Sequence, residues 1–374
     1  MKIRKLDTDN KKDIAQFIHF PFALYKDCPQ WVPPLRSEMS LVMNRKKHPF
    51  YHHSVADFFV AESEKETLAR VAVLNNNNYN QHHNSRTAFF YYFDAVNDPS
   101  VVQALFEAVF AWARGYNLNL VLGPRGFLRS NGIGLLVEGF EFMPAMGIPY
   151  NFPYYQTLIE NVGFEKQTDY LSGYLDRTQQ LPQRMFEAAE RIKERGNFWV
   201  KTFRNKKEMR EFIPFVNEVH YKAFHKNPGF YPTTDEEFKM IANTMIQIAE
   251  PEYVKLIMKG ADVVGFVLGY PNVSHALQKT KGKLLPFGWI TILNEKRHTR
   301  LGDLNGVGLL PEYQGMGANI LLYVELEKTL RQSPFEKVEL VQVDERNFKS
   351  KSDMETLGVN WKKRHRLYQY PLFQ

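Results

Sequence analysis

Two related segments about 200 residues apart constrain the fold of this chain more than any other feature of its sequence. Residues 25–33 and 225–232 each follow a helical pattern, and each joins Lys-Asp or Lys-Asn to a Pro, an aromatic residue and a second Pro. Near the end of each half, Gly163 and Gly358 close a helical pattern before an alternating strand. Two matches in the same order predict a duplicated architecture rather than one large fold.

The length of the chain supports the same division. A chain of 374 residues exceeds what one hydrophobic core usually supports, so two domains are expected. We predict a first domain at residues 1–178 and a second at 179–374, joined near the polar stretch at 176–182. A hydrophobic content of 44% and a charged content of 24% are usual for globular domains.

Composition excludes several classes of protein. The single cysteine, Cys28, excludes an intramolecular disulfide and a cysteine-based metal cluster. The histidine pairs at 52–53 and 82–83 lack a carboxylate at metal-ligand spacing, so no metal site is predicted. No stretch approaches the ~20 apolar residues of a membrane span, so we expect a cytoplasmic protein without a membrane or DNA partner. The net charge of +7 favours an anionic partner, either a phosphorylated ligand or RNA.

The order of predicted elements is similar in the two halves. In the first half, the pattern predicts strands at 57–61, 68–73, 88–93 and 118–122 and a long helix at 100–116. In the second half it predicts helices at 209–224, 235–249, about 314–331 and 347–357, and strands at 253–258, 263–268, 304–310, 338–343 and 366–370. An insertion at 271–300 has no counterpart in the first half, and its residues 274–281 are predicted to be helical.

The segment at 306–323 is the one that indicates chemistry. An apolar strand leads into a turn containing Pro311, and a Gly-spaced turn at Gly315 and Gly317 then opens an amphipathic helix. A helix N-terminus has unpaired amide groups and a partial positive charge that suit a phosphate, and glycines let the main chain approach it closely. A P-loop would need Gly-Lys-Ser/Thr, which is missing here. The spacing alone leaves phosphate binding and tight packing as alternatives.

Residues 314–319, Gln-Gly-Met-Gly-Ala-Asn, resemble motif A of the GNAT acetyltransferases, Gln/Arg-x-x-Gly-x-Gly/Ala, which follows a strand ending Val-x-Pro-x-Tyr. The last position departs from the family, because Asn319 adds bulk near the phosphates. As in that family, an Asn follows the next strand and starts a helix; here Asn347 precedes Leu-Gly-Val at 357–359. The resemblance covers residues 253–371 directly, apart from the insertion at 271–300, and the first half only through the internal repeat.

The resemblance implies an α/β (α+β) fold of two tandem GNAT-like acyl-CoA N-acyltransferase domains, each a mixed, mostly antiparallel sheet flanked by helices. It also implies acetyl-CoA, or another acyl-CoA, as the cofactor. The main chain of Leu309 and Leu310 would hold the acyl carbonyl and the pantetheine arm, and Asn347 would contact the pantetheine. The pyrophosphate would bind main-chain amides of Gln314, Gly315, Met316, Gly317, Ala318 and Asn319.

The resemblance leaves the proton donor open. Many members of the family use a Tyr, seven residues after this Asn, to protonate the departing thiolate. In this chain that position is Met354, and a thioether cannot donate a proton. Tyr323, Tyr368 and Tyr370 are alternative donors, as is solvent. The proton acceptor is expected to be a carboxylate or a chain of water molecules, and Asp303 or Glu312, which flank the central strand, could supply the carboxylate.

The first half lacks the predicted cradle. The corresponding strand-to-helix junction at residues 93–100 has no paired glycines, and its two Asp residues would repel phosphate. Asn97 or Asp98 is expected to cap the following helix, with Pro99 in its first turn. We therefore predict a degenerate first domain that shapes the substrate site.

These features predict an N-acyltransferase that moves an acetyl or other acyl group from acyl-CoA to a small amine, through positioning and main-chain polarisation of the thioester. Two alternatives remain from other classes. One is a non-catalytic protein that binds or senses acyl-CoA, and the other is a tandem-GNAT aminoacyl transferase that uses charged tRNA. The acceptor, the acyl chain length and the oligomeric state are left open at this stage.

Overall fold

The computed structural model describes residues 1–314 and 318–372 and divides into two compact units. Unit 1 comprises Met1–Leu171, Ser274–Leu293 and Lys362–Gln374, and unit 2 comprises Ser172–Val273 and Asn294–Trp361. Both units are therefore assembled from separate stretches of sequence. The domain boundary predicted near residues 176–182 stays a prediction.

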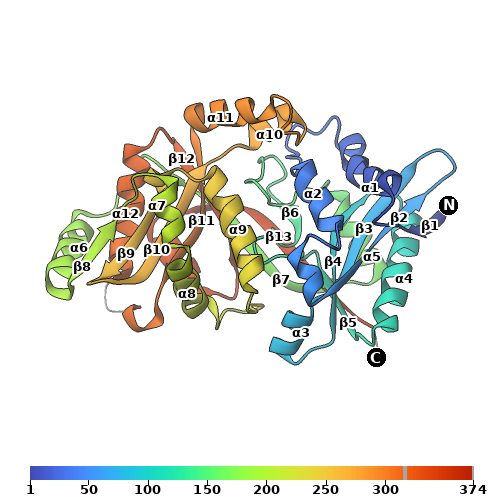
Figure 1. The fold of residues 1–374 in the computed structure, drawn as a ribbon, viewed down its shortest axis with the longest axis horizontal. Helices are drawn as coiled ribbons and strands as arrows, with labels where there is room; N and C mark the ends of the chain where they lie inside the picture. Colours follow the sequence, from blue (N-terminus) through green and yellow to red (C-terminus); the bar gives the residue numbers. More distant parts are fainter. Residues whose placement is uncertain (315–317, 373–374) are drawn as a thin grey trace. The chain divides into compact units, whose positions relative to one another are not determined.

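Unit 1 is built on a sheet of strand order β1-β2-β3-β4-β5-β13, in which β6 also pairs with β13 (Figure 1). All of these pairs are antiparallel except β4 with β5, which is parallel. The strands are β1 (Lys2–Lys5), β2 (Val55–Glu62), β3 (Thr67–Asn75), β4 (Thr87–Ala95), β5 (Leu120–Gly123), β6 (Leu135–Glu138) and β13 (Asn360–Pro371). The helical elements are α1 (Lys11–Leu24), α2 (Arg36–Met43), η1 (Pro49–His52), α3 (Asn77–His83), α4 (Pro99–Gly115), α5 (Tyr154–Val162) and α10 (Ser274–Thr280).

The sequence of helix α4 explains both how this helix packs on the sheet of unit 1 and where it begins. Its apolar residues recur at helical spacing and pack on the sheet, with Phe106 and Val109 fully buried. The Asp98 side chain accepts hydrogen bonds from the amides of Ser100 and Val101, and Pro99 occupies the first turn. The strand-to-helix junction of unit 1 is therefore a capped helix start, as its sequence predicted.

Unit 2 contains the strand order β7-β12-β11-β10-β9-β8. The pairs β8–β9, β9–β10 and β10–β11 are antiparallel, and β11–β12 is parallel. The strands are β7 (Glu165–Asp176), β8 (Phe198–Lys201), β9 (Val254–Lys259), β10 (Asp262–Pro271), β11 (Leu301–Leu309) and β12 (Lys337–Asp344). Mixed, mostly antiparallel sheets flanked by helices confirm the predicted α/β class.

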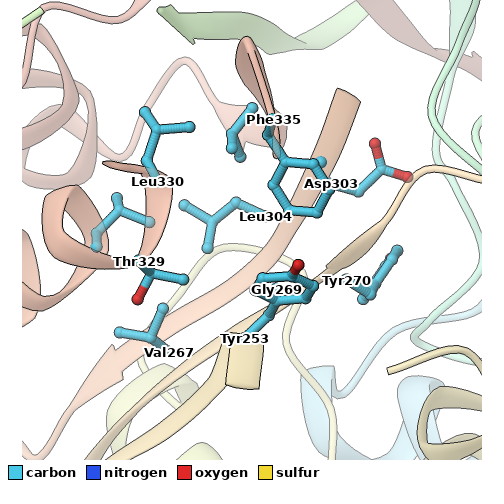
Figure 2. Close-up of a pocket in the computed structure, with 12 residues that line it drawn as sticks. Tyr253, Val267, Gly269, Tyr270, Asp303, Leu304, Thr329, Leu330 and Phe335 are labelled. Atoms are coloured by element: carbon cyan, nitrogen blue, oxygen red, sulfur yellow. The ribbon is translucent and has the colours of Figure 1, made fainter. Parts of the chain in front are cut away.

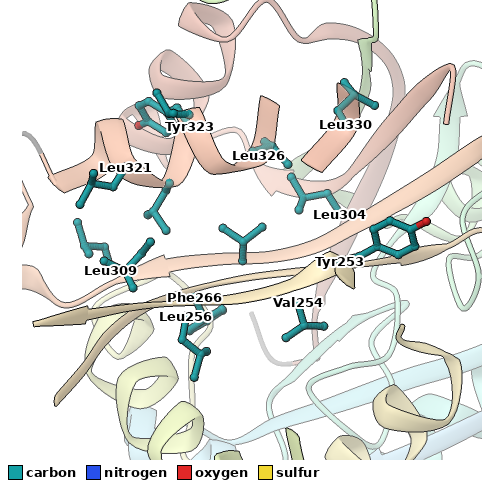
Figure 3. Close-up of a cluster of buried hydrophobic side chains, with 14 of the residues drawn as sticks. Tyr253, Val254, Leu256, Phe266, Leu304, Leu309, Leu321, Tyr323, Leu326 and Leu330 are labelled. Carbon is teal, nitrogen blue, oxygen red and sulfur yellow. The ribbon is translucent and has the colours of Figure 1, made fainter. Parts of the chain in front are cut away.

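Helices cover both faces of this sheet. The helical elements are α6 (Gln183–Gly196), α7 (Lys206–Glu211), α8 (Ile213–Phe224), α9 (Asp235–Ile248), η2 (Pro251–Tyr253), η3 (Pro311–Tyr313), α12 (Ala318–Gln332) and α13 (Phe348–Thr356). Helix α11 (Gly288–His298) begins in the stretch assigned to unit 1 and ends in unit 2. Figure 3 shows Leu321 and Leu326 of α12 directed toward Leu304 and Leu309 of β11. Helix α8 packs on the other face, where Phe224 lies beside Gly308.

One predicted helix of unit 2 is wrong in detail. The sequence predicted a single helix at 209–224, whereas the structure has α7 and α8, which meet at Phe212. Pro214 stands in the first turn of α8, and a proline there has no amide to continue the preceding helix.

Candidate functional site

The two parallel strands β11 and β12 pair over only part of their length. Their register begins at Leu301 and ends where Leu304 lies opposite Leu340. β11 continues to Leu309 and β12 to Asp344, but no further pairing between them occurs among the described residues. The two strands therefore diverge after Leu304. We call the divergent main chain of residues 305–309 and 341–344 the fork.

Main-chain groups point alternately to the two sides of β11. The amide of Leu310 donates to the carbonyl of Val264 on β10 at 2.9 Å, and the carbonyl of Leu310 accepts from the amide of Tyr313 at 3.0 Å. Because neighbouring residues of a strand direct these groups to opposite sides, those of Leu309 point into the fork. There the Leu309 carbonyl accepts a hydrogen bond of 2.8 Å from the side chain of Gln314. Of the two predicted positions, Leu309 is thus the one at the fork.

The predicted phosphate cradle follows η3 directly. Gln314 is extended, with φ −73° and ψ 136°, and α12 is described from Ala318. The helix therefore does not begin at Gln314 as predicted. The predicted contacts at Gly315, Met316 and Gly317 lie outside the described residues. The ammonium group of Lys349 donates to Gln314 Oε1 at 2.8 Å, which places a positive charge beside the cradle.

Helix α13 starts next to the end of β12. The side chain of Asn347 caps this helix by accepting a hydrogen bond of 3.1 Å from the amide of Ser350. Seven residues further on, Met354 is buried in the hydrophobic core of unit 2. Its place is therefore explained by packing, and the position supplies no proton.

Tyr323 lies between α12 and α13. Its side chain is buried, and its hydroxyl interacts electrostatically with the carboxylate of Asp353. Burial, followed by the contact with Asp353, raises the pKa of Tyr323 well above its usual range, so the phenol keeps its proton at neutral pH. Glu312, by contrast, is an exposed residue of η3. The catalytic roles of both residues stay predictions.

The two other candidate tyrosines belong to unit 1. The hydroxyl of Tyr368 donates to Glu160 at 3.1 Å, and the ring of Tyr370 stacks on Phe110 with centroids 4.3 Å apart. Both lie on the part of β13 that pairs with β5. Their contacts are accounted for by the folding of unit 1.

A row of polar side chains crosses the sheet where the fork begins. Tyr270 on β10 lies opposite Asp303 on β11, which in turn lies beside Glu339 on β12. Residues in register on neighbouring strands share a face, so the three side chains lie in line. Leu304, the next residue, points to the face covered by α12, so the row lies on the opposite face (Figure 3). Asp303 is 1% exposed and Glu339 0%, and the site therefore buries two adjacent carboxylates.

Hydrogen bonds hold this row in place. The side-chain amide of Asn272 donates to Asp303 Oδ1 at 2.8 Å. Asn305 is the extra residue of a β-bulge, because Leu304 and Gly306 are paired with consecutive residues of β10, and its side chain donates to the hydroxyl of Tyr270 at 2.7 Å. Burial, and then the charge of Asp303, raises the pKa of Tyr270 well above its usual range.

Sequence reasoning missed two of the three members of the row, Tyr270 and Glu339. Burial, followed by the charge of Glu339, raises the pKa of Tyr174 on β7 well above its usual range. The signal in the sequence was a single acidic residue between Val338 and Leu340 in an apolar strand. A charge at such a position is rarely buried without a partner or a role.

The glycines of β11 are explained by packing. A Cβ on Gly308 would lie 2.7 Å from Cζ of Phe266 and 3.3 Å from Cε2 of Phe224. A Cβ on Gly306 would lie 3.3 Å from Phe266. These two glycines therefore admit the Phe266 ring against the strand, and the phosphate-binding interpretation depends on the later glycines alone.

A small cavity of about 20 Å³ lies under the first half of β11, and hydrocarbon groups form most of its wall. Figure 2 shows Leu304, Leu330 and Phe335 around it, with the carboxylate of Asp303 directed away. Its volume is that of about one water molecule. The cavity is therefore a packing defect beneath α12 and does not belong to the fork.

Several solved structures resemble this chain over its whole length. A tandem GNAT protein from the clavulanic acid biosynthesis pathway covers 100% of this chain and 99% of its own, with a TM-score of 0.58 and 12% identity. This chain has a tandem GNAT-like fold. GCN5-related N-acetyltransferases from Sphaerobacter thermophilus and Anabaena variabilis share this fold. The first has a TM-score of 0.52 and 15% identity and covers 100% of this chain and 96% of its own. The second has a TM-score of 0.54 and 9% identity and covers 100% of this chain and 73% of its own.

Two curated proteins are similar in sequence. Protein YghO of Escherichia coli is 27% identical over 373 residues, covering 96% of this chain and 93% of its own. The bacterial ceramide synthase of Caulobacter vibrioides is 28% identical over 284 residues, covering 75% and 73%. No protein-family model matches the chain.

Proposed function

We propose that unit 2 transfers an acyl group from an acyl-CoA to an amine. The observation that carries this proposal is the fork in the sheet with two buried carboxylates, Asp303 and Glu339, at its base. The tandem GNAT-like fold supports acyl-CoA as the donor, and the relative named ceramide synthase supports an N-acylated product, since a ceramide is an amide.

The residues of the fork suit acyl-CoA. The secondary amides of a pantetheine arm pair with an exposed strand edge as a peptide does, and Val307 and Leu309 direct main-chain groups to that side of β11. The start of α12 follows, where helix amides favour a pyrophosphate, and Lys349 adds a positive charge. The proposed contacts are Leu309, Gln314, Gly315, Met316, Gly317, Ala318, Asn319 and Asn347. Leu310 is left out because its amide donates to Val264 and its carbonyl accepts from Tyr313.

Acyl-CoA supplies an acyl group activated as a thioester. Two adjacent buried carboxylates attract the ammonium form of the acceptor, and Asp303 or Glu339 takes its proton. The neutral nitrogen then attacks the thioester carbonyl, the carbon–sulfur bond breaks, and the nitrogen releases a second proton, which replaces the one that the thiolate takes from its donor. We assign to Tyr323 the proton that the departing thiolate takes, because its phenol is protonated at neutral pH.

The acceptor class follows from the curated relative. We propose a long-chain amino alcohol, the amine part of a ceramide, as the first acceptor to test. The small amine predicted from the sequence is the second. The two classes differ above all in the length of the hydrocarbon chain, so an assay that includes both types compares them directly.

Titration calorimetry with acetyl-CoA and palmitoyl-CoA, followed by thiol release in the presence of each amine, tests the proposal. We expect micromolar binding of one acyl-CoA and amine-dependent thiol release. Asp303→Asn and Glu339→Gln should each reduce turnover by about 10²-fold or more with acyl-CoA binding retained, whereas Glu312→Gln, which removes an exposed carboxylate, should leave turnover unchanged. If only Glu312→Gln lost turnover, the proton acceptor would be Glu312 of η3 instead of Asp303 or Glu339.

Two outcomes would replace the proposal. Acyl-CoA binding without thiol release with any amine would favour the sensing protein, which the buried Met354 makes the second candidate. No binding of any acyl-CoA would reject the donor and favour an aminoacyl transferase that uses charged tRNA.

A further inference from the structure

The chain between β10 and β11 carries a dense group of exposed apolar side chains. Among the described residues, eleven large hydrophobic side chains are exposed, and five of them lie within residues 285–293. Leu285 is 79% exposed and Phe287 72%. These five side chains are Leu285, Phe287, Trp289, Ile290 and Leu293. A cluster of this kind on a folded protein marks an interaction surface.

The charged side chains between residues 274 and 293 are all positive, and the next acidic residue along the chain is Glu295. Residues 274–293, which belong to unit 1, contain no Asp or Glu. Their three lysines, Lys279, Lys281 and Lys283, are all exposed. Lys283 is close enough to His19 of α1 to help lower its pKa, after burial and the charge of Arg36. The surface therefore combines a group of exposed apolar side chains at 285–293, which we call the tip, with a positively charged flank formed by the three lysines.

Hydrogen bonds anchor this segment to the rest of unit 1. The side chain of Gln278 donates to the carbonyls of Pro29 and Trp31 at 2.7 and 2.9 Å. The amide of Arg36 donates to the carbonyl of Gly282 at 3.0 Å, and its guanidinium donates to the carbonyl of Lys281 at 3.0 Å. The apolar side chains thus extend from a fixed base.

We propose that residues 274–293 bind the surface of a bilayer that contains anionic lipids. Trp289, Phe287 and Leu285 enter the boundary between headgroups and acyl chains, where aromatic and aliphatic side chains of peripheral proteins reside. The lysines lie beside them and attract lipid phosphates. The positive charge of these lysines is complementary to anionic lipids. It favours a membrane over a protein partner, because a protein interface does not require a flank without acidic side chains.

This surface replaces the expectation, drawn from the missing apolar span, that the chain has no membrane partner. None of the described helices is long and apolar enough to cross a bilayer. The proposed attachment is therefore peripheral and reversible, and it needs no segment of the length that a span requires.

Sedimentation with vesicles of phosphatidylcholine, with and without phosphatidylglycerol, tests the proposal with the intact chain. We expect the protein to bind the anionic vesicles. Leu285→Ser/Phe287→Ser should weaken this binding by about 100-fold, because two exposed apolar side chains no longer enter the lipid. The matched control Phe215→Ser/Tyr221→Ser removes two exposed aromatic residues of α8 and should bind like the unaltered chain.

A second variant tests the charge separately. Lys279→Gln/Lys281→Gln/Lys283→Gln should weaken binding to anionic vesicles by about 100-fold and should abolish most of its salt dependence. Circular dichroism and thermal unfolding show whether the variants remain folded, which the exposure of the altered side chains leads us to expect.

Three results would overturn the proposal. The first is a wild-type chain that does not sediment with anionic vesicles, and the second is a tip variant that binds as tightly as the control. The third is a dimer in sedimentation velocity that only the tip variant loses, which would assign the surface to a second copy. None of these measurements uses acyl transfer, so they stand or fall apart from the proposed function.

Discussion

Replacing Gly308 with alanine tests whether β11 carries its glycines for packing. The added Cβ would lie 2.7 Å from Cζ of Phe266, whereas carbon atoms in contact are ~3.5–4.0 Å apart. The ring of Phe266 is fully buried and lies against His220 and Phe224, with centroids 6.1 and 6.3 Å away. It therefore has little room to turn aside.

An overlap of this size in a filled core costs about 1–3 kcal/mol. We expect Gly308→Ala to lower the free energy of unfolding of unit 2 by about 2 kcal/mol. Gly306→Ala, with its nearest contact at 3.3 Å, should cost less than about 1 kcal/mol. Gly115→Ala, with nothing within 4 Å at the end of a helix in unit 1, should be neutral or stabilising by a few tenths of a kcal/mol.

Urea unfolding followed by circular dichroism measures this series, and a double-mutant cycle with Phe266→Leu identifies the clash. The shorter side chain frees space for the new methyl group, so the two substitutions together should cost at least about 1 kcal/mol less than the sum of the single changes. Strict additivity, or equal effects at Gly308 and Gly115, would refute the packing explanation and return these glycines to a ligand-binding role.

Three further predictions concern protonation and the fork. Burial, which disfavours a second proton on the ring, lowers the pKa of His365 to about 4 despite the opposing effect of its hydrogen bond of 3.0 Å to the carbonyl of Pro149. The folded pKa lies below the unfolded value of about 6.5, so the contribution of His365 to the free energy of unfolding is complete above that pH and is lost toward pH 4. Between about pH 7 and about pH 5, the free energy of unfolding of the unaltered chain should therefore fall by about 2 kcal/mol more than that of His365→Gln, as measured by urea unfolding. Parallel pH curves for the two proteins would contradict this. Tyr323→Phe should lower kcat about 10²-fold with little change in the KM for acyl-CoA, and an unchanged kcat in steady-state assays would remove it as the proton donor. Lys349→Gln should weaken acyl-CoA binding a few-fold in calorimetry without altering the thermal unfolding of the free chain, and equal Kd values would exclude its charge from the cradle.

Local patterns in the sequence were enough to predict most elements of the fold. Helix α4, its Asp98 cap and the helix end at Gly163 depend on residues close together in the chain, and the structure has all three. The resemblance at residues 314–319 led to the tandem GNAT-like fold. The break between α7 and α8 was missed although Pro214 indicates it, because the apolar pattern at 209–224 continues across a proline that fits best in the first turn of a helix.

The site was predictable only in part because its geometry depends on the register of distant strands. Asp303 was a candidate because it flanks the central strand, but its neighbour Glu339 comes from a strand 36 residues further along, and only the pairing of Leu301 to Leu304 with β12 brings them together. No local pattern fixes that register. The exposure of Leu285 and Phe287 was likewise hidden, since an apolar run reads as core until its surroundings are known.

The pairing of β13 with β5 has a consequence for how the protein is made. Residues 368–371, near the end of the chain, lie opposite Gly123 to Leu120 in unit 1. During synthesis the first 171 residues therefore leave the ribosome with Val121 and Leu122, which are buried in the finished protein, on an open sheet edge. Expressing the N-terminal half alone should yield aggregates, and a separately supplied peptide of the last strand should rescue its solubility.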